Sequence, residues 1–412
     1  MDTKQPLNAT KHYKYYPDEP DISPLFAYGF RPIFLLLAPY MVISAFLWTL
    51  YYTGSLPLHF ENPLEWHIYE FLFGVGIAGI MAFLFTGLPE LFPGLVPIVG
   101  KRLKMIIALW VAGRVAFWLM PFIGTTIVGI INISLWLVVI AYAFKPVVLD
   151  RLQRHSSIAY TLVALVVLQV IYFAALGGYI DIPTMDILKL SVGVMMVLIV
   201  LADRRVSMEA INERLEHEKI DDVFVAKPFR YNLAVFTILL FSLVEFFYPS
   251  MHSTLGWLGF GAGAAILGVI NDLNLKFESL KDEPFAYYMA AIALLMALGY
   301  FFLGYSYLFD FGFRGNYMHF LTSGAFGLSF YVVMVVVTYV HTGRVLKSNW
   351  WVMLGVVLIV VSTFLRALID EIGGSYVGVL HAATLLWILP FVIYWIKTKD
   401  FLLSPRVDGI KG

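Results

Sequence analysis

The chain of 412 residues is 60% hydrophobic and only 14% charged, and its 28 basic and 28 acidic residues give a net charge of zero. Soluble globular chains are nearer a quarter charged, so this composition is typical of a membrane protein. The zero net charge gives no indication of a nucleic-acid partner. The absence of cysteine excludes disulfide bonds, thiolate-bound metals, iron–sulfur clusters and covalent Cys-x-x-Cys-His haem attachment.

Twelve apolar runs follow one another along the chain, and each is long enough to cross a bilayer, which takes ~20 mostly apolar residues of helix. The runs are continuous rather than alternating, so they favour helices over the short strands of a barrel. The fourth run follows the third so closely that the two must form a hairpin. We therefore predict an all-α polytopic membrane protein with about 12 transmembrane helices, at 32–52, 67–88, 104–122, 124–144, 157–177, 185–203, 231–248, 254–271, 285–306, 317–340, 350–368 and 376–397.

Basic residues divide the connections between these runs into two classes. Of the 28 Lys and Arg residues, 24 lie in the two tails and in every second connection. The opposite connections hold only Lys189, Arg314 and Arg366, and Arg114 lies inside a run. Because Lys and Arg are enriched in cytoplasmic loops, both termini are predicted to be cytoplasmic.

This topology predicts a cytoplasmic tail at 1–31, one membrane domain at 32–397 and a second cytoplasmic tail at 398–412. The longest cytoplasmic connection, 204–230, divides the membrane domain into six plus six spans. We expect a short surface helix within it, ending at Pro228.

Ionisable residues at membrane depth are costly, and they are therefore the first candidates for function. The even-numbered spans run from outside to inside, so residues that open them, or that close odd-numbered spans, lie near the outer face. Glu245 belongs to the outer half and His341 to the inner face. The outer group comprises His67, Glu70, His319, Arg366, Asp370, Glu371 and His381.

Three spans each bring one histidine to a similar outer depth: His67, His319 and His381. Two imidazoles from facing helices can hold a non-covalent b-type haem, and imidazole with carboxylate or Met also suits copper. We predict a haem or copper site built from two or three of these histidines, with Arg366 available to pair with a haem propionate. The alternative is that each histidine bonds a neighbouring helix or interfacial water.

Other polar residues allow more than one interpretation. Glu70 shares a helical face with His67 and could orient its ring or relay protons, or it could simply suit the positive end of a helix. Arg114 has no partner in its own span, and a pair with Glu245 is one alternative. The sequence from His341 to Arg344 suits a helix stop, with an anion or propionate site as the alternative.

Four groups of segments together resemble the NnrS family of polytopic membrane proteins. They are 26–32, then 66–74 with 82–86 and 109–114, then 341–344, and finally 405–412. The resemblance implies a haem- and copper-containing protein of the bacterial inner membrane, tied to nitric oxide stress and denitrification. The resemblance favours, as functional residues, those that fall on family motifs: His67, Glu70, Arg114, His341 and Arg344. His319 lies where a family histidine is expected. His381 aligns with no family motif.

The chain departs from the family pattern at Tyr69, where a second histidine is usual. If that histidine is a ligand in relatives, this chain binds one metal fewer, or uses Tyr69 or His381 instead. We therefore expect a divergent member that binds haem b and copper.

The function expected from this resemblance is a sensor, a scavenger or an oxidoreductase that acts on nitric oxide. Because the chain has no electron-entry domain, a quinol or a redox partner would have to supply electrons. Two alternatives from other classes stay open. One is a cofactor-free transporter or channel whose path is marked by Arg114 and Glu245, and the other is a membrane scaffold for a respiratory enzyme.

Overall fold

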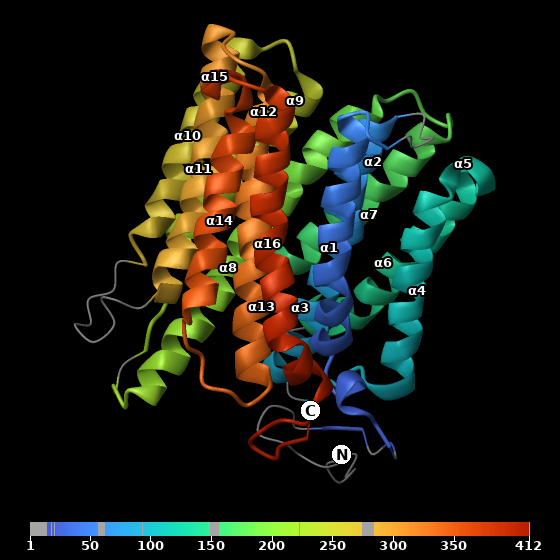
Figure 1. The fold of residues 1–412 in the computed structure, drawn as a ribbon, viewed down its shortest axis with the longest axis vertical. Coiled ribbons are helices and arrows are strands. Elements are labelled where there is room, and N and C mark those ends of the chain that lie inside the picture. Colours follow the sequence, from blue (N-terminus) through green and yellow to red (C-terminus); the bar gives the residue numbers. More distant parts are fainter. Residues whose placement is uncertain are drawn as a thin grey trace.

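The computed structural model describes residues 15–17, 19, 21–56, 62–92, 94–148, 156–221, 223–273 and 284–411. Helices are the regular elements of this described part, and they run mostly along one direction (Figure 1). The predicted all-α class is therefore confirmed. The first half comprises η1 (Pro24–Phe26), α1 (Phe30–Tyr52), α2 (Pro63–Tyr69), η2 (Glu70–Val75), α3 (Gly76–Leu91), α4 (Gly100–Trp118), α5 (Met120–Ile123), α6 (Thr125–Val148), α7 (Ser156–Leu176) and α8 (Thr184–His217).

The second half comprises α9 (Pro228–Phe247), α10 (His252–Ile270), α11 (Pro284–Phe309), α12 (Arg314–His319), η4 (Phe320–Phe326), α13 (Gly327–His341), α14 (Trp350–Ala367), α15 (Ile369–Ile372) and α16 (Tyr376–Leu403). Eleven continuous helical stretches in the described residues are long and apolar enough to cross a membrane. The chain is thus a multi-pass membrane protein.

The third predicted span corresponds to α4, which is 19 residues long and is not among those eleven stretches. It carries three basic residues in its first turns, Lys101, Arg102 and Lys104, and Arg114 near its end. These charges lower its hydropathy although it packs along α6. The short α5 connects the two, so the predicted hairpin of the third and fourth spans is present.

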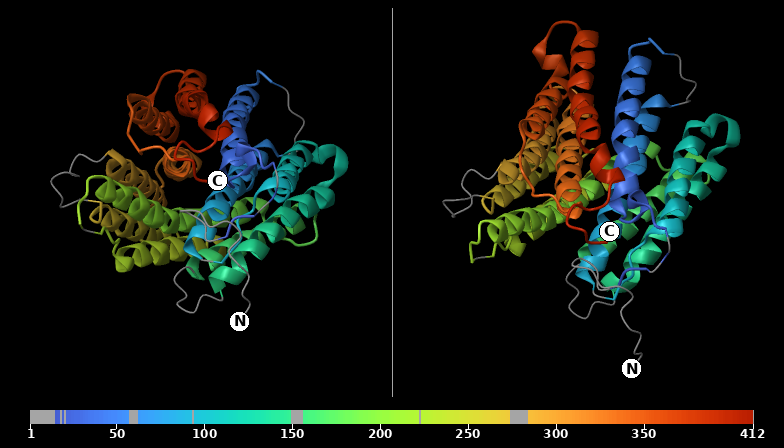
Figure 2. Two further views of the ribbon diagram at one scale, coloured as in Figure 1. Left: turned by 90° about the horizontal axis from the view of Figure 1, so that it is seen from below. Right: turned by 60° about the horizontal axis from the view of Figure 1, so that its bottom comes forward.

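Consecutive helices pack beside one another from α6 through α7, α8 and α9 to α10 and α11, while α14, α16 and α1 form a second continuous series. Helix α8 lies between the two halves and contacts α2, α7, α9, α11 and α13. Figure 2 shows the chain-terminal helix α16 beside α1 when the bundle is seen from below. Helices far apart in sequence therefore share one interior.

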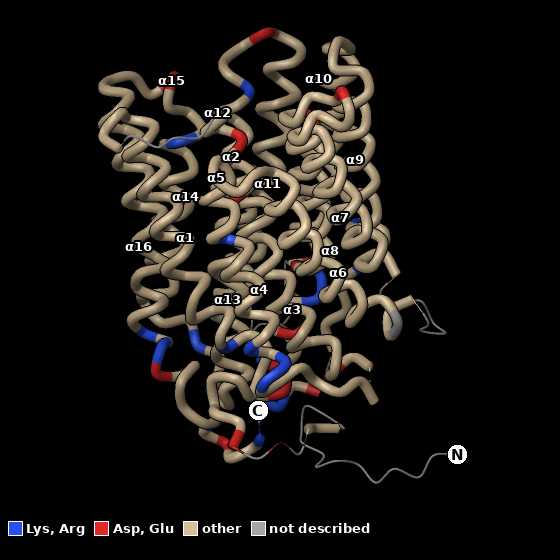
Figure 3. Tube along the Cα trace, turned by 90° about the vertical axis from the view of Figure 1, so that its right-hand side faces the viewer, with Lys and Arg blue, Asp and Glu red and all other residues tan. Residues whose placement is uncertain are grey.

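Charged residues are most frequent at the end of the bundle that holds the C-terminus, as Figure 3 shows. Arg31 at the start of α1 donates hydrogen bonds to the carbonyls of Phe401, Leu402 and Ser404 at the end of α16. Both ends of the membrane domain thus meet at this face, which the distribution of Lys and Arg predicts to be cytoplasmic. The guanidinium supplies partners for carbonyls that the helix end leaves unsatisfied.

The segment predicted as a surface helix within 204–230 is not separate from the sixth span. Helix α8 continues without a break from Thr184 to His217, over 34 residues. Its cytoplasmic extension buries Val206, Ala210, Ile211 and Leu215 against the rest of the protein.

Candidate functional site

A cavity of about 690 Å³ lies between α1, α2, α8, α11, η4, α14 and α16. We call it the main cavity. Its walls include His67, His319, Arg366 and Glu245, which the sequence placed at outer depth. The structure therefore brings these four side chains to one space, and the apolar walls around them come from aromatic, Leu and Met residues.

Two of the helices that bound the main cavity contain π-helical turns at matching places. In one span η2 begins three residues after His67, and in the other η4 begins directly after His319. A π turn adds a residue to the helical repeat and is frequent at functional sites. Here it changes the helix face presented to the interior just below each histidine.

The ring of His319 is held by its own helix. Its Nδ1 lies 3.0 Å from the carbonyl oxygen of Gly315 and 3.2 Å from that of Asn316. Because both partners are acceptors, Nδ1 carries the proton and donates it. The lone pair of the neutral ring is then on Nε2, the arrangement that suits a metal ligand.

The ring of His67 is held by stacking. It lies parallel to the indole of Trp48, with the ring centroids 4.3 Å apart and the planes 8° apart. Its Nδ1 is buried and makes no hydrogen bond with any residue that the structure describes. A buried polar atom of this kind is costly unless a ligand or water satisfies it.

A cation lies beside both imidazoles. Arg366 donates a 2.7 Å hydrogen bond to the amide oxygen of Asn316, and the amide nitrogen of Asn316 donates one of 2.7 Å to Asp370. Arg366 is close enough to His67 and His319 to interact with both electrostatically. A positive charge beside neutral imidazoles suits an anionic ligand group in the cavity.

The remaining outer candidates make other contacts. Glu245 also lines the main cavity, where it accepts a 2.8 Å hydrogen bond from Tyr307. Glu371 accepts one from Tyr317. His381 is not among the residues that line the main cavity, and its Nδ1 bonds to the carbonyl of Val377 at 2.8 Å.

Glu70 and Arg114 form a buried ion pair with two contacts of 2.8 and 2.7 Å. Arg114 thus pairs with Glu70 and not with Glu245. It also donates to Asn132, while Glu70 accepts a hydrogen bond from Tyr40. The sequence left the pair open because the two residues lie 44 positions apart.

Tyr69, at the position where a family histidine is usual, points away from the main cavity. Its ring stacks on Phe117 and Tyr172, and its hydroxyl accepts a 2.6 Å hydrogen bond from Gln169. These contacts place its oxygen in the interface with α4 and α7. The structure therefore does not bring Tyr69 to the side of the helix that carries His67.

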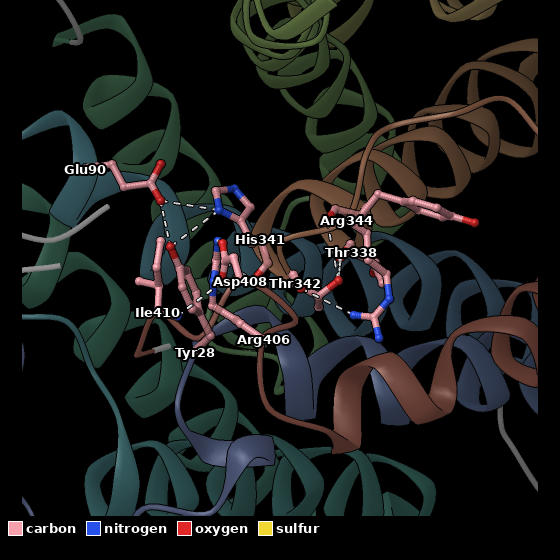
Figure 4. A network of polar contacts seen from close by, with 10 residues as sticks. Tyr28, Glu90, Thr338, His341, Thr342, Arg344, Arg406, Asp408 and Ile410 are labelled. Atoms are coloured by element: carbon pink, nitrogen blue, oxygen red, sulfur yellow. Dashed lines mark hydrogen bonds and ion pairs between the residues drawn. The ribbon is translucent and has the colours of Figure 1, made fainter. Parts of the chain in front are cut away.

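A second polar cluster lies at the end of the bundle that holds the C-terminus (Figure 4). Tyr28 donates a 2.7 Å hydrogen bond to Glu90, and Nδ1 of His341 lies 3.3 Å from the same carboxylate oxygen. Arg406 donates to the carbonyl of His341 at 2.8 Å and pairs with Asp408 at 2.5 Å. We call these five residues the inner cluster.

The inner cluster joins the inner ends of the two spans that contain π turns. Nearby, Gly343 has φ of +74°, and a Cβ there would lie 2.7 Å from the carboxyl carbon of Asp408. The guanidinium of Arg344 lies 3.9 Å from the ring centroid of Phe401. His341 and Arg344 thus belong to a helix stop packed under the C-terminal tail, at the opposite end of the tenth span from His319.

Sequence reasoning missed Trp48, Asn316, Glu90 and Tyr28 as partners of the candidate residues. Tyr28, Glu90 and Arg406 lie in or beside the segments that carry the family resemblance, which was the available signal. Trp48 and Asn316 carry no such signal, because stacking and amide contacts between distant spans leave no pattern in one sequence.

The fold and this site define a polytopic helical membrane protein with a cavity between its spans that presents two histidines from different spans. The model of the family described as NnrS protein matches residues 24–406. The chain therefore belongs to the NnrS family. A comparison with curated proteins gives no match.

Proposed function

We propose that this protein is a haem-binding member of the NnrS family that acts in the response to nitric oxide in the bacterial inner membrane. The observation that carries the proposal is the placement of His67 and His319. Their rings come from two spans that each contain a π turn, and both residues line one cavity.

The residues of the main cavity fit a b-type haem. Nε2 of His319 has its lone pair available, and Nδ1 of His67 is a buried atom that lacks a partner within the described residues. Trp48 and Trp387 contribute flat apolar walls. Arg366 would hold a propionate, and the cavity of about 690 Å³ is in the range of sites that hold large ligands.

Bound haem would supply an iron that takes nitric oxide and exchanges single electrons. The protein's own residues would bind the haem, fix the ring planes of the histidines and exclude water from the apolar walls. Glu245 and Tyr307, which also line the main cavity, offer a carboxylate and a hydroxyl from which a proton could be delivered. A quinol or a redox partner is the proposed source of electrons.

Copper is the second part of the proposal. Groups of three or more His, Cys, Asp and Glu with metal-binding geometry are absent from the described residues. A copper ion would therefore need the two imidazoles together with a thioether, and Met185, Met195 and Met318 line the main cavity. Thioethers select Cu(I). Haem and copper would thus compete for the same histidines.

The test is the visible spectrum of purified protein, oxidised and dithionite-reduced, with iron and copper analysis of the same sample. We expect a stoichiometric Soret band, sharp α and β bands after reduction, and iron in excess of copper. A flat spectrum from protein produced with ample haem would contradict the proposal. Substrate-dependent flux by such metal-free protein in liposomes would then favour the transporter.

A further inference from the structure

A second, smaller cavity of about 70 Å³ lies below the main cavity, between α1, α3, α7, α8 and α13. We call it the small cavity. One of its lining residues, Ser329, follows His319 by ten positions, which is ~15 Å toward the cytoplasmic face along a helix. The small cavity therefore lies at the level of the apolar middle of the bundle, and it is partly open, because lining residues such as Phe83, Ile158 and Phe330 are only partly buried.

The lining of the small cavity is apolar. Apart from Ser329 it consists of glycine, alanine, aliphatic, methionine and phenylalanine side chains. The hydroxyl of Ser329 donates its hydrogen bond to Asp203, at 3.2 Å. One water needs ~10–15 Å³ and two to four polar partners, so the space is large enough for water but lacks the groups that would hold it. Apolar cavities of this kind stay dry and take up xenon or similar apolar guests.

The wall between the two cavities is a flexible side chain. Met195 lines both of them, and its methyl group lies 2.8 Å from where a Cβ at Gly76 would be. Phe326 lines the main cavity and Phe330 the small one, with ring centroids 4.3 Å apart. Methionine adapts its shape readily because it has an unbranched chain with three rotatable bonds. Rotation of Met195 would connect the two spaces.

We propose that the small cavity binds a small apolar gas molecule and passes it to the main cavity past Met195. The binding of the gas follows from the size and lining of the cavity alone. Its identity as nitric oxide rests on the proposed function. A polar or ionic ligand is excluded from the small cavity because binding would leave its polar groups unpaired.

Xenon is the probe, and methionine methyl groups are the reporters. The full-length protein in lipid nanodiscs, labelled with ¹³C at methionine methyls, is equilibrated with increasing xenon pressure. Met195 and Met334 line the small cavity, whereas Met105 is exposed on α4. We expect saturable shifts for the Met195 and Met334 methyls and only a small, linear shift for Met105.

The matched variants fill the small cavity or leave it unchanged. Ala202 lines it, and Ala202→Leu adds three carbons there. Ala108 is exposed on α4, so Ala108→Leu adds the same atoms outside it. We expect the saturable xenon shift at Met334 to be lost in the first variant and kept in the second. Loss in both variants, or retention in both, would contradict the proposal.

Two further outcomes on the unmodified protein are decisive. Equal, non-saturating shifts at Met334 and Met105 would show simple partition of xenon into the apolar phase and would overturn the proposal. Contacts from lipid acyl protons to the Met334 methyl that xenon does not displace would assign the cavity to an acyl chain instead. Xenon binding needs no haem. The xenon test of the small cavity can therefore succeed when the haem spectrum contradicts the proposed function, and it can fail when the spectrum supports that function.

Discussion

The buried pair of Glu70 and Arg114 offers the sharpest test of how the interior is held together. The side chains are 0% and 4% exposed, so neither charge has access to bulk solvent. Arg114→Leu removes two contacts of 2.8 and 2.7 Å to Glu70 and leaves its carboxylate buried without a cation. Breaking a buried pair by removing one partner typically costs about 3–5 kcal/mol.

We therefore expect Arg114→Leu to lower the free energy of unfolding by about 3–5 kcal/mol. The double variant Glu70→Gln with Arg114→Leu should recover most of that loss, because it removes both buried charges. Unfolding is followed by tryptophan fluorescence in mixed micelles with increasing SDS.

The control is Arg205→Leu, which breaks the half-exposed pair of Arg205 with Glu209 at 3.3 Å. Exposed pairs contribute about 0–1 kcal/mol. If Arg114→Leu costs no more than this control, or if the double variant is as unstable as the single one, the reasoning about the buried charge is refuted.

Three further outcomes concern other contacts. Gly74→Ala should destabilise the fold about as much as Arg114→Leu, because the added Cβ would collide with the Arg114 guanidinium. The same SDS titration measures the free energy of unfolding of this variant, and unchanged stability would contradict the close approach of Gly74 and Arg114. Arg406→Ala should release the C-terminal tail, seen as faster hydrogen exchange at the amide of Val407, and unchanged exchange would argue that other contacts hold it. Hydrogen bonding from Arg406 lowers the pKa of Asp408 to about 2. The stability that the ionised Asp408 gives to the docked tail is therefore complete above the usual pKa of that carboxyl, 3.8, and is lost as pH falls through 2. Val407 exchange, corrected for intrinsic rates, should then show the same protection at pH 5 and pH 7, and a loss at pH 5 would contradict that pKa.

The all-α class and the spans could be predicted because hydropathy acts locally along the chain. In the described residues, eleven of the twelve predicted spans correspond to helical stretches long and apolar enough to cross a membrane, and the remaining one corresponds to the less apolar α4. A common outer depth for His67, His319 and Arg366 followed, as a prediction, from the placement of Lys and Arg. Their lateral proximity did not, because it depends on the packing of α1, α8, α14 and α16 around the two spans. His381 has a similar predicted depth but lies outside the lining of the main cavity, which only the structure distinguishes.

The π turns also escaped prediction. Apart from Glu70, a run such as Glu70–Val75 is apolar whether its helical repeat is 3.6 residues or wider, so hydropathy cannot reveal the added residue. The partner of Arg114 was missed for a related reason. Glu70 was assigned to the outer face by its place at the start of a span, although the helix begins at Pro63 and Glu70 is fully buried.

The central claim is that His67 and His319 hold one haem, and the haem content of three histidine variants tests it most directly. His67→Ala and His319→Ala should each abolish or greatly reduce the reduced low-spin bands, whereas His381→Ala should keep them. Monodisperse elution of all three variants from size exclusion serves as the check on folding. Full haem content in both His67→Ala and His319→Ala would contradict the account.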